Sequence, residues 1–131
     1  FEPLFAKVAM KPGRPVWAGR AGSCWVIGLP GNPGSALVTA RLLLATMLAR
    51  LQGRSSGDVL AWHRLPLAAP LEGAGARETF TRARWTPTGL VALDNQDSGA
   101  QATLAAAHWL IRRPPHCPPC VAGDWVEAVS M

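Results

Sequence analysis

Long apolar runs fill the first part of the chain, and shorter segments that alternate between apolar and polar residues follow, with the change near Gly53. In the first part, the segments Pro15 to Gly19 and Cys24 to Leu29 predict a pair of short strands around a turn. The second segment is apolar on both faces, which is typical of a strand buried inside an α/β sheet. The pattern therefore predicts the end of an α/β unit.

A long helix is expected from about Pro33 to about Gln52. Asn32 is a favourable N-cap residue, and Pro33 suits the first helical position because its missing N–H costs nothing there. Gly53 is a favourable terminator, and an exposed linker, RSSGD, follows it. The apolar positions at helical spacing are Leu37, Ala40, Leu43, Leu44, Met47, Leu48 and Leu51, and the narrow polar edge consists of Thr39, Thr46 and Arg50. The pattern predicts a mostly buried helix.

From Asp58 onward the apolar positions recur with a period of two. The segment Glu78 to Thr86 alternates as a strand does, with Phe80 on its packed side, and TPTG then turns into LVAL. The alanine-rich segment Ala100 to His108 predicts a short helix, and WLIRR and DWVEAV predict two further strands. Several short strands with turns between them predict a small barrel or sandwich.

The composition is that of a folded globular protein. Of the 131 residues, 49% are hydrophobic and 16% are charged, which is far from the pattern of a disordered chain. The net charge of +5 and the isoelectric point of about 10.1 indicate attraction to an acidic partner. A phosphate ligand, a nucleic acid and an anionic membrane would each satisfy this condition.

Three further features predict the setting of the chain. Arg41 and Arg50 bracket the longest apolar run, so no uninterrupted apolar stretch of roughly 18 to 20 residues is present, and a soluble protein is expected. The start, FEPLFAKVAM, has neither an initial Met nor a signal-peptide pattern, so we expect an internal start with further residues upstream. Three cysteines do not make the even set of a small secreted domain, which favours a reducing, cytoplasmic setting.

The strand-to-helix junction LPGNPGS is the first candidate for chemistry. A strand that ends in a Gly-containing turn and enters a helix places free backbone N–H groups and the positive end of the helix dipole at one point, where anions bind. The segment is neither a Walker loop nor GxGxxG. The alternative is a capped helix in which Gly31 only permits a left-handed turn. Ser35, in the first helical turn, offers a hydroxyl to the backbone or to a ligand.

Cations cluster in two other segments. In MKPGRP, Lys11 and Arg14 flank a stiff Pro-Gly turn and can clamp an anion, although a basic surface turn is the simpler interpretation. Further along, Arg77 precedes a strand on which Arg82 and Arg84 share one face, and such a face is usually solvated. The turn NQDSG adds the hydroxyl of Ser98 near a helix start.

The segment HCPPC, His116 to Cys120, has the CxxC spacing of a dithiol or of half a zinc site. A thioredoxin-like motif needs a helix after it, whereas here a strand is expected. A zinc site needs further ligands, for which the chain offers Cys24, His63 and His108. We therefore expect a proline-stiffened surface hairpin.

Read together and in order, MKPGRP, GLPGNPGSALVT, RETFTRA, QDSG and AGDWVE resemble the C-terminal part of the MoeA-type molybdopterin molybdenumtransferases, a family that includes the plant enzyme and the E domain of gephyrin. The family pattern is approximately KPGKP, LPGNPVSA, R-x-x-F-x-R, Q-x-S and GE-x-V. Each motif alone is weak, but LPGNP after KPGxP is specific. The resemblance covers nearly the whole chain.

The resemblance implies the fold and the activity. Residues 1–53 would be the C-terminal part of a three-layer α/β domain that binds molybdopterin, and residues 58–131 a small C-terminal β-barrel domain. The family inserts molybdate into adenylylated molybdopterin and releases AMP, with Mg²⁺ assisting, as a homodimer in the cytoplasm. A chain without the front of the α/β domain is expected to be inactive alone. The alternative is a gephyrin-like scaffold that binds molybdopterin without turnover.

The resemblance also implies site residues. Arg14, Ser35 and Arg77 would be catalytic, and no metal ligand is expected within this chain. Molybdate and the substrate phosphates would contact Lys11, Arg14, Pro15, Gly31, Asn32, Ser35, Arg77 and Ser98. Two departures from the family pattern are Arg14 in place of Lys and Gly34 in place of Val.

A nucleic-acid-binding barrel is a further alternative. Such barrels usually carry exposed aromatic residues beside the basic ones, whereas the other aromatic residue on the strand of Trp85, Phe80, is expected on the packed side. We therefore expect small-molecule ligands, and neither a nucleic acid nor a membrane as partner.

Overall fold

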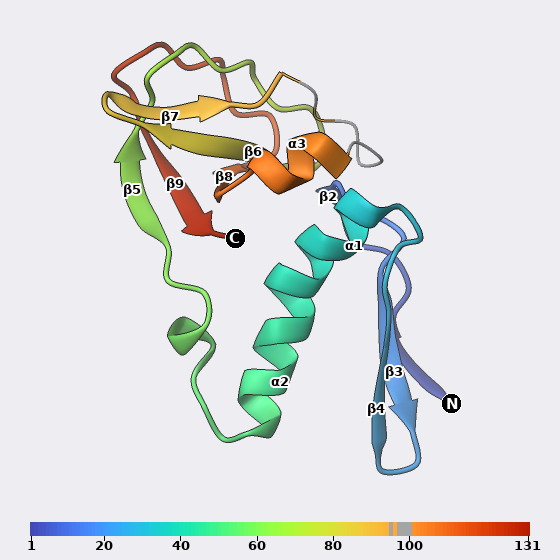
Figure 1. Cartoon of the computed structure of the whole chain (residues 1–131). Coiled ribbons are helices and arrows are strands. Elements are labelled where there is room, and N and C mark those ends of the chain that lie inside the picture. The colour runs from blue at the N-terminus through green and yellow to red at the C-terminus, as the bar shows by residue number, and fades with distance from the viewer. Residues whose placement is uncertain (95, 97–100) are drawn as a thin grey trace.

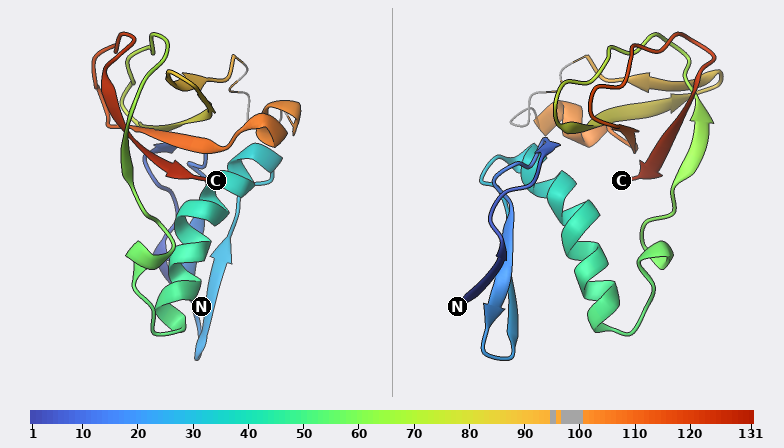
Figure 2. Two further views of the ribbon diagram at one scale, coloured as in Figure 1. Left: turned by 60° about the vertical axis from the view of Figure 1, so that its left-hand side comes forward. Right: turned by 180° about the vertical axis from the view of Figure 1, so that it is seen from behind.

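The computed structural model describes residues 1–94, 96 and 101–131 of the chain. The fold is mostly β, with one long helix whose N-terminal end lies against the larger sheet (Figure 1). The smaller sheet has three antiparallel strands in the order β1-β3-β4, formed by Glu2–Phe5, Trp17–Ala21 and Cys24–Gly28. Figure 2 shows that this sheet and the helix extend together from one side of the larger sheet.

The larger sheet has six strands and curls into a small barrel. Its strands are β2 (Met10–Lys11), β5 (His63–Pro66), β6 (Glu78–Thr86), β7 (Gly89–Ala92), β8 (Trp109–Arg113) and β9 (Trp125–Ser130). They run in the order β2-β6-β8-β9-β5, and β7 pairs with β6. A bridge between Leu67 and Leu90 links the end of β5 to β7 and closes the ring. The predicted barrel is confirmed, as is the short helix α3 (Gln101–Ala106).

The helix runs from Pro33 to Leu51 and has three parts: α1 (Pro33–Thr39), the π-helical turn η1 (Ala40–Leu44) and α2 (Ala45–Leu51). Asn32 occupies the N-cap position, but its side chain makes no cap hydrogen bond, contrary to expectation. The C-terminal end is as predicted. Gly53 has a φ of +75° and donates to the carbonyl of Arg50, and Arg54 donates to that of Ala49, which is a Schellman ending.

The prediction of a mostly buried helix is wrong for this chain. Leu37, Leu48 and Leu51 are 44%, 47% and 55% exposed, whereas the face with Val38 and Leu42 is buried. Thr39, assigned to the polar edge, is fully buried and donates its hydroxyl to the carbonyl of Ser35 at 2.7 Å. Periodicity identifies an apolar stripe, but which side of the stripe is covered depends on the elements that pack against it.

By length and composition this helix also passes the test for a membrane span. It has 19 residues, and an 18-residue window has a mean hydropathy of 1.4 despite Arg41 and Arg50. Core helices pass the same test, and 33% of the window is buried inside the fold. Two arginines within the apolar run therefore do not distinguish a membrane span from a core helix.

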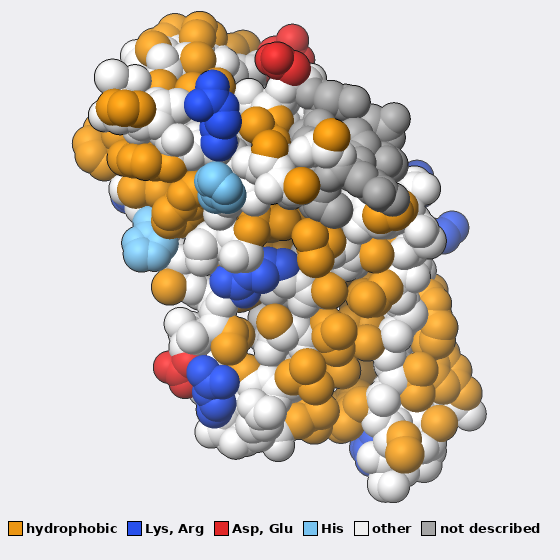
Figure 3. All heavy atoms as spheres, in the orientation of Figure 1, with side chains coloured by type: hydrophobic (Ala, Val, Ile, Leu, Met, Phe, Trp, Pro, Cys, Tyr) orange, Lys and Arg blue, Asp and Glu red, His pale blue; other side chains and the backbone are white. Residues whose placement is uncertain are grey.

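The predicted three-layer α/β domain is not present in the described residues, which contain one small antiparallel sheet and one long helix in this region. The strand expected to be buried, β4, is the last in the order of its sheet, and Cys24 and Trp25 on it are exposed. Hydrophobic side chains consequently show over much of the surface of the helix and the small sheet (Figure 3).

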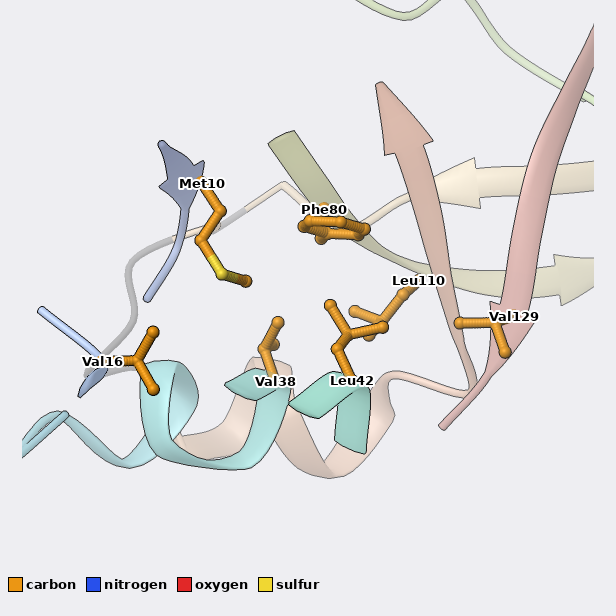
Figure 4. Close-up of a cluster of buried hydrophobic side chains, with 7 residues drawn as sticks. All are labelled: Met10, Val16, Val38, Leu42, Phe80, Leu110 and Val129. Carbon is orange, nitrogen blue, oxygen red and sulfur yellow. The ribbon is translucent and has the colours of Figure 1, made fainter. Parts of the chain in front are cut away.

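One hydrophobic core joins the helix to the barrel. The cluster consists of Met10, Val16, Val38, Leu42, Phe80, Leu110 and Val129 (Figure 4). Phe80 is 8% exposed, which confirms its predicted burial. A second cluster fills the barrel with Leu67, Ala83, Leu90, Ile111, Val126 and Ala128. The first cluster holds the helix start and the segment around Met10 against strand β6, and this contact shapes the candidate site.

Candidate functional site

A cleft of about 1040 Å³ lies between the Lys11–Pro15 turn, the first turn of the helix and the mouth of the barrel. The predicted site residues that line it are Lys11, Arg14, Pro15, Ser35 and Arg77. These residues are far apart in sequence, and the fold brings them to one hollow. Gly31 and Asn32 are exposed and are not among the described lining residues, and Ser98 lies outside the described residues.

Pairing between β2 and β6 fixes the Lys11–Pro15 turn to the barrel. The two strands are parallel, with Met10 opposite Glu78 and Lys11 opposite Thr79, and the Glu78 amide donates to the carbonyl of Ala9 at 3.0 Å. Arg77 immediately precedes this contact. The register therefore places the basic turn beside Arg77, which precedes the strand.

The turn itself is built around Gly13. The Lys11–Pro12 peptide bond is cis, and Gly13 has a φ of +111°, a conformation that favours glycine. A Cβ at Gly13 would collide with the Cγ2 methyl of Thr39 on the helix. The close approach between the turn and the helix therefore requires glycine, and it brings the turn near Ser35, which is 6% exposed.

Cations dominate the lining of the cleft. Its described lining contains the five basic residues Lys11, Arg14, Arg77, Arg82 and Arg113 and the two acidic residues Glu72 and Asp94. Lys11 and Arg14 are exposed, so their charged groups are available to a ligand. A concave surface with excess positive charge attracts polyanions and raises their local concentration.

Arg82 and Gln96 hold each other at one side of the cleft. The Gln96 side chain accepts from the Arg82 amide at 3.0 Å and donates to the Arg82 carbonyl at 2.9 Å, as a neighbouring strand would. In return, the guanidinium of Arg82 bonds the backbone carbonyl of Gln96. Arg82 is 1% exposed, whereas Arg84 on the same face is exposed, so the expected solvated arginine face is wrong for Arg82.

Arg113 and Gln96 were not identified from the sequence. Gln96 could have been identified from the sequence, because it is the glutamine of the QDSG motif, two residues before Ser98. The sequence does not distinguish Arg113 from its neighbour Arg112. Only the fold shows that Arg113 is 5% exposed and lines the cleft, whereas Arg112 faces outward.

The prediction of a hairpin is wrong for the HCPPC segment, because among the described residues it pairs with the distant segment 71–75 and not with a neighbouring strand. The Cys117 amide donates to the carbonyl of Pro114 to close a turn, and Cys120 then exchanges hydrogen bonds with Leu71. The Ala74 amide donates to the Cys117 carbonyl, so HCPPC runs extended beside residues 71–75, which line the cleft. Over an extended stretch, residues three apart have Cα atoms separated by roughly 10 Å, beyond the reach of a disulfide.

Neither a dithiol pair nor a zinc site is therefore built from HCPPC in this conformation. Among the described residues, no group of three or more His, Cys, Asp or Glu side chains could hold a metal ion. The two carboxylates of the cleft, on Glu72 and Asp94, are both exposed and do not make a resident Mg²⁺ site.

Sequence comparison supports the architecture. A family model described as "MoeA C-terminal region (domain IV)" matches residues 64–131. A molybdopterin molybdenumtransferase from Synechococcus elongatus is 33% identical over 114 residues, which cover 84% of this chain and 27% of that protein. One from Haemophilus influenzae is 50% identical over 50 residues, which cover 38% of this chain and 12% of that protein. The chain thus spans about a quarter or less of the length of these relatives.

Solved structures show the same fold. A molybdopterin biosynthesis MoeA protein from Pyrococcus horikoshii superposes with a TM-score of 0.82 and 25% identity over 98% of this chain and 32% of that chain. A molybdenum cofactor biosynthesis protein from Pyrococcus furiosus superposes with a TM-score of 0.84 and 21% identity, over 98% and 45% of the two chains. Together with the family match over more than half of its residues, these likenesses show that the chain belongs to the MoeA C-terminal region (domain IV) family.

Proposed function

We propose that this chain supplies one wall of the active site of a molybdopterin molybdenumtransferase and so acts in molybdenum cofactor biosynthesis. The observation that carries the proposal is the convergence of Lys11, Arg14, Ser35 and Arg77 on one cationic cleft. The names of the relatives give the reaction class. In this proposal, residues 1–53 belong to the molybdopterin-binding domain and residues 58–131 form the C-terminal barrel domain.

The proposed reaction joins molybdate to adenylylated molybdopterin and releases AMP. Molybdate is a dianion and the substrate phosphates are negative, so the two repel each other when they meet. Arg14 and Arg77 would bind oxyanion oxygens through their planar forks, and Lys11 would add a point charge. Ser35 would donate its hydroxyl to the same anion. These contacts would lower the repulsion and orient molybdate for attack by the two dithiolene sulfurs, which replace one oxo ligand as it leaves as water with the two thiol protons. Water would cleave the phosphoanhydride and release AMP.

Other parts of the assembly belong to the proposal as well. The described residues do not build a Mg²⁺ site, so no step is assigned to Mg²⁺ here, and its ligands would come from outside this chain. We infer a homodimer in the cytoplasm by analogy with the family. Molybdopterin nucleotide and molybdate are the proposed small-molecule partners.

The test uses the whole protein that carries this chain. It is incubated with adenylylated molybdopterin, molybdate and Mg²⁺, and AMP is measured over time. Molybdate-dependent AMP release is expected. Its absence in a protein that still binds molybdopterin would contradict the enzyme and leave the non-catalytic scaffold.

Single substitutions test which residues bind molybdate. Arg14→Ala and Ser35→Ala should each raise the molybdate concentration needed for half-maximal AMP release by about tenfold, the loss of roughly one charge-assisted hydrogen bond. Arg20→Ala is the matched control, because Arg20 is exposed on β3, stacks on Trp25 and does not line the cleft. An unchanged molybdate dependence in Arg14→Ala or Ser35→Ala would remove that residue from the site.

A further inference from the structure

Arg113 lies where the barrel meets the cleft. It is the last residue of β8 and stands opposite Thr79 of β6, two residues after Arg77. Its side chain lines the cleft, although the residue is only 5% exposed. Arg113 therefore sits beside the point at which the segment that carries Arg77 enters the sheet.

The guanidinium of Arg113 joins three segments. Its Nη1 donates to the sulfur of Cys120 at 2.9 Å, and its Nη2 donates to the carbonyls of Pro118 at 2.6 Å and Glu72 at 3.1 Å. Because the fork of arginine is planar and rigid, three acceptors held at once fix the relative places of β8, the HCPPC segment and the segment 70–77.

The segment 70–77, which we call the cleft wall, has little regular structure of its own. Leu71 in it exchanges hydrogen bonds with Cys120 at 3.0 and 2.8 Å. Its Ala74 amide donates to the Cys117 carbonyl at 3.1 Å, and its Gly75 carbonyl accepts from the His116 amide at 2.8 Å. The HCPPC segment thus holds the cleft wall by backbone hydrogen bonds, and Arg113 ties both segments to strand β8.

A buried guanidinium is costly to desolvate, and an apolar side chain of similar volume often packs in such a place without that cost. The Nε of Arg113 is buried and has no hydrogen-bond partner among the described residues, which adds to the cost. The role of an arginine here therefore lies in the three hydrogen bonds that it donates to Cys120, Pro118 and Glu72.

We propose that Arg113 is a positioning residue that holds the cleft wall, and through it Arg77, in place to bind an oxyanion. This inference rests on the function proposed above, because it takes molybdate as the anion. Arg113 itself stays inside the barrel mouth and contacts the carbonyls of the wall, while Arg77 reaches the ligand.

The first test measures molybdate binding by the 131-residue chain with titration calorimetry in a double-mutant cycle. Arg113→Met should weaken molybdate binding about five- to tenfold. Arg113→Lys keeps the charge without the planar fork, so it should weaken binding by about half as large a factor. In an Arg77→Ala background, Arg113→Met should cause no further loss, because its effect passes through Arg77. Equal losses in both backgrounds, or parent-like binding by Arg113→Met, would overturn the proposal.

The second test needs no ligand and separates this proposal from the function on which it rests. Amide hydrogen exchange at Leu71 and Ala74 should quicken at least tenfold in Arg113→Met, while exchange at Leu110 and Ile111 in the core stays as in the parent. If the parent chain does not bind molybdate, the proposed function fails and the exchange result alone decides whether Arg113 holds the wall. Unchanged exchange at Leu71 and Ala74 would overturn the positioning role.

Arg112→Met is the matched control for both measurements. Arg112 lies on the same strand but faces outward, where it pairs with Glu78 and Glu127 and stacks over Trp62. The hydrogen bond that Arg112 donates to the Glu78 carboxylate raises the pKa of Arg112 above its ordinary value. Arg112→Met should leave molybdate affinity and exchange in the cleft wall unchanged, and an effect as large as that of Arg113→Met would also overturn the proposal.

Discussion

Gln96 satisfies the backbone of Arg82 in the way that a neighbouring strand would, with one hydrogen bond to the amide and one to the carbonyl. A third bond runs from the Gln96 amide to the carbonyl of Leu93 at 2.7 Å. The Arg82 carbonyl also accepts from the Leu93 amide at 2.9 Å, so the Gln96 side chain adds to the backbone pairing at this side of the cleft.

Gln96→Ala should lower the free energy of unfolding by about 1–3 kcal/mol, because it removes the Gln96 oxygen that accepts from the partly buried Arg82 amide, while the Arg82 carbonyl keeps its bond from Leu93. Urea denaturation of the chain measures the loss. Gln52→Ala serves as the control, since Gln52 is exposed at the end of the helix and should change stability by less than about 0.5 kcal/mol. Equal stability of the two variants would show that the Gln96 contacts contribute nothing.

Gly13 offers a second prediction at this scale. Gly13→Ala places a Cβ against the Thr39 methyl and also strains a φ of +111°, so it should displace the Lys11–Pro15 turn and weaken molybdate binding. Gly22→Ala has a φ of +60° and open space around its Cβ, so it should cost about 1 kcal/mol of stability and leave binding intact. Calorimetry with molybdate compares the two, and parent-like affinity in Gly13→Ala would contradict the role given to this turn.

At the scale of elements, the long helix shows which features follow from local sequence. Its start at Pro33 and its ending at Gly53 follow from proline at the first position and glycine in a left-handed conformation, both of which are local properties. The buried face does not follow, because it is selected by contacts with Phe80 and Leu110 of the barrel. The same reason explains β2, whose two residues pair only because β6 lies beside them.

Two leucines of the helix test this account of its packing. Leu42 is 7% exposed in the core that joins the helix to the barrel, whereas Leu48 is 47% exposed on the other side. Leu42→Ala should lower the free energy of unfolding by about 2–4 kcal/mol, and Leu48→Ala by less than about 1 kcal/mol. Urea denaturation distinguishes them, and a larger loss for Leu48→Ala would mean that the helix buries its other face in solution.

At the scale of the whole molecule, the cleft joins residues that are up to about a hundred positions apart in sequence, from Lys11 to Arg113. Five of the site residues implied by the family motifs meet there. The motifs predict which residues take part in the site, but they do not predict how these residues lie in space. The HCPPC segment and Arg113 support the cleft wall through contacts between segments that are far apart in sequence. Spacing along the chain carries no signal for such contacts.

The central claim is that this cleft binds an oxyanion between the basic turn, the helix start and the barrel. Crystals of the chain soaked with tungstate, a heavier oxyanion of the same shape and charge as molybdate, test it through the anomalous scattering of tungsten. The account predicts one tungsten peak within hydrogen-bonding distance of Arg14, Ser35 or Arg77, and its loss in Arg77→Ala crystals. A peak elsewhere, no peak at saturating tungstate, or a peak unaffected by Arg77→Ala would contradict it.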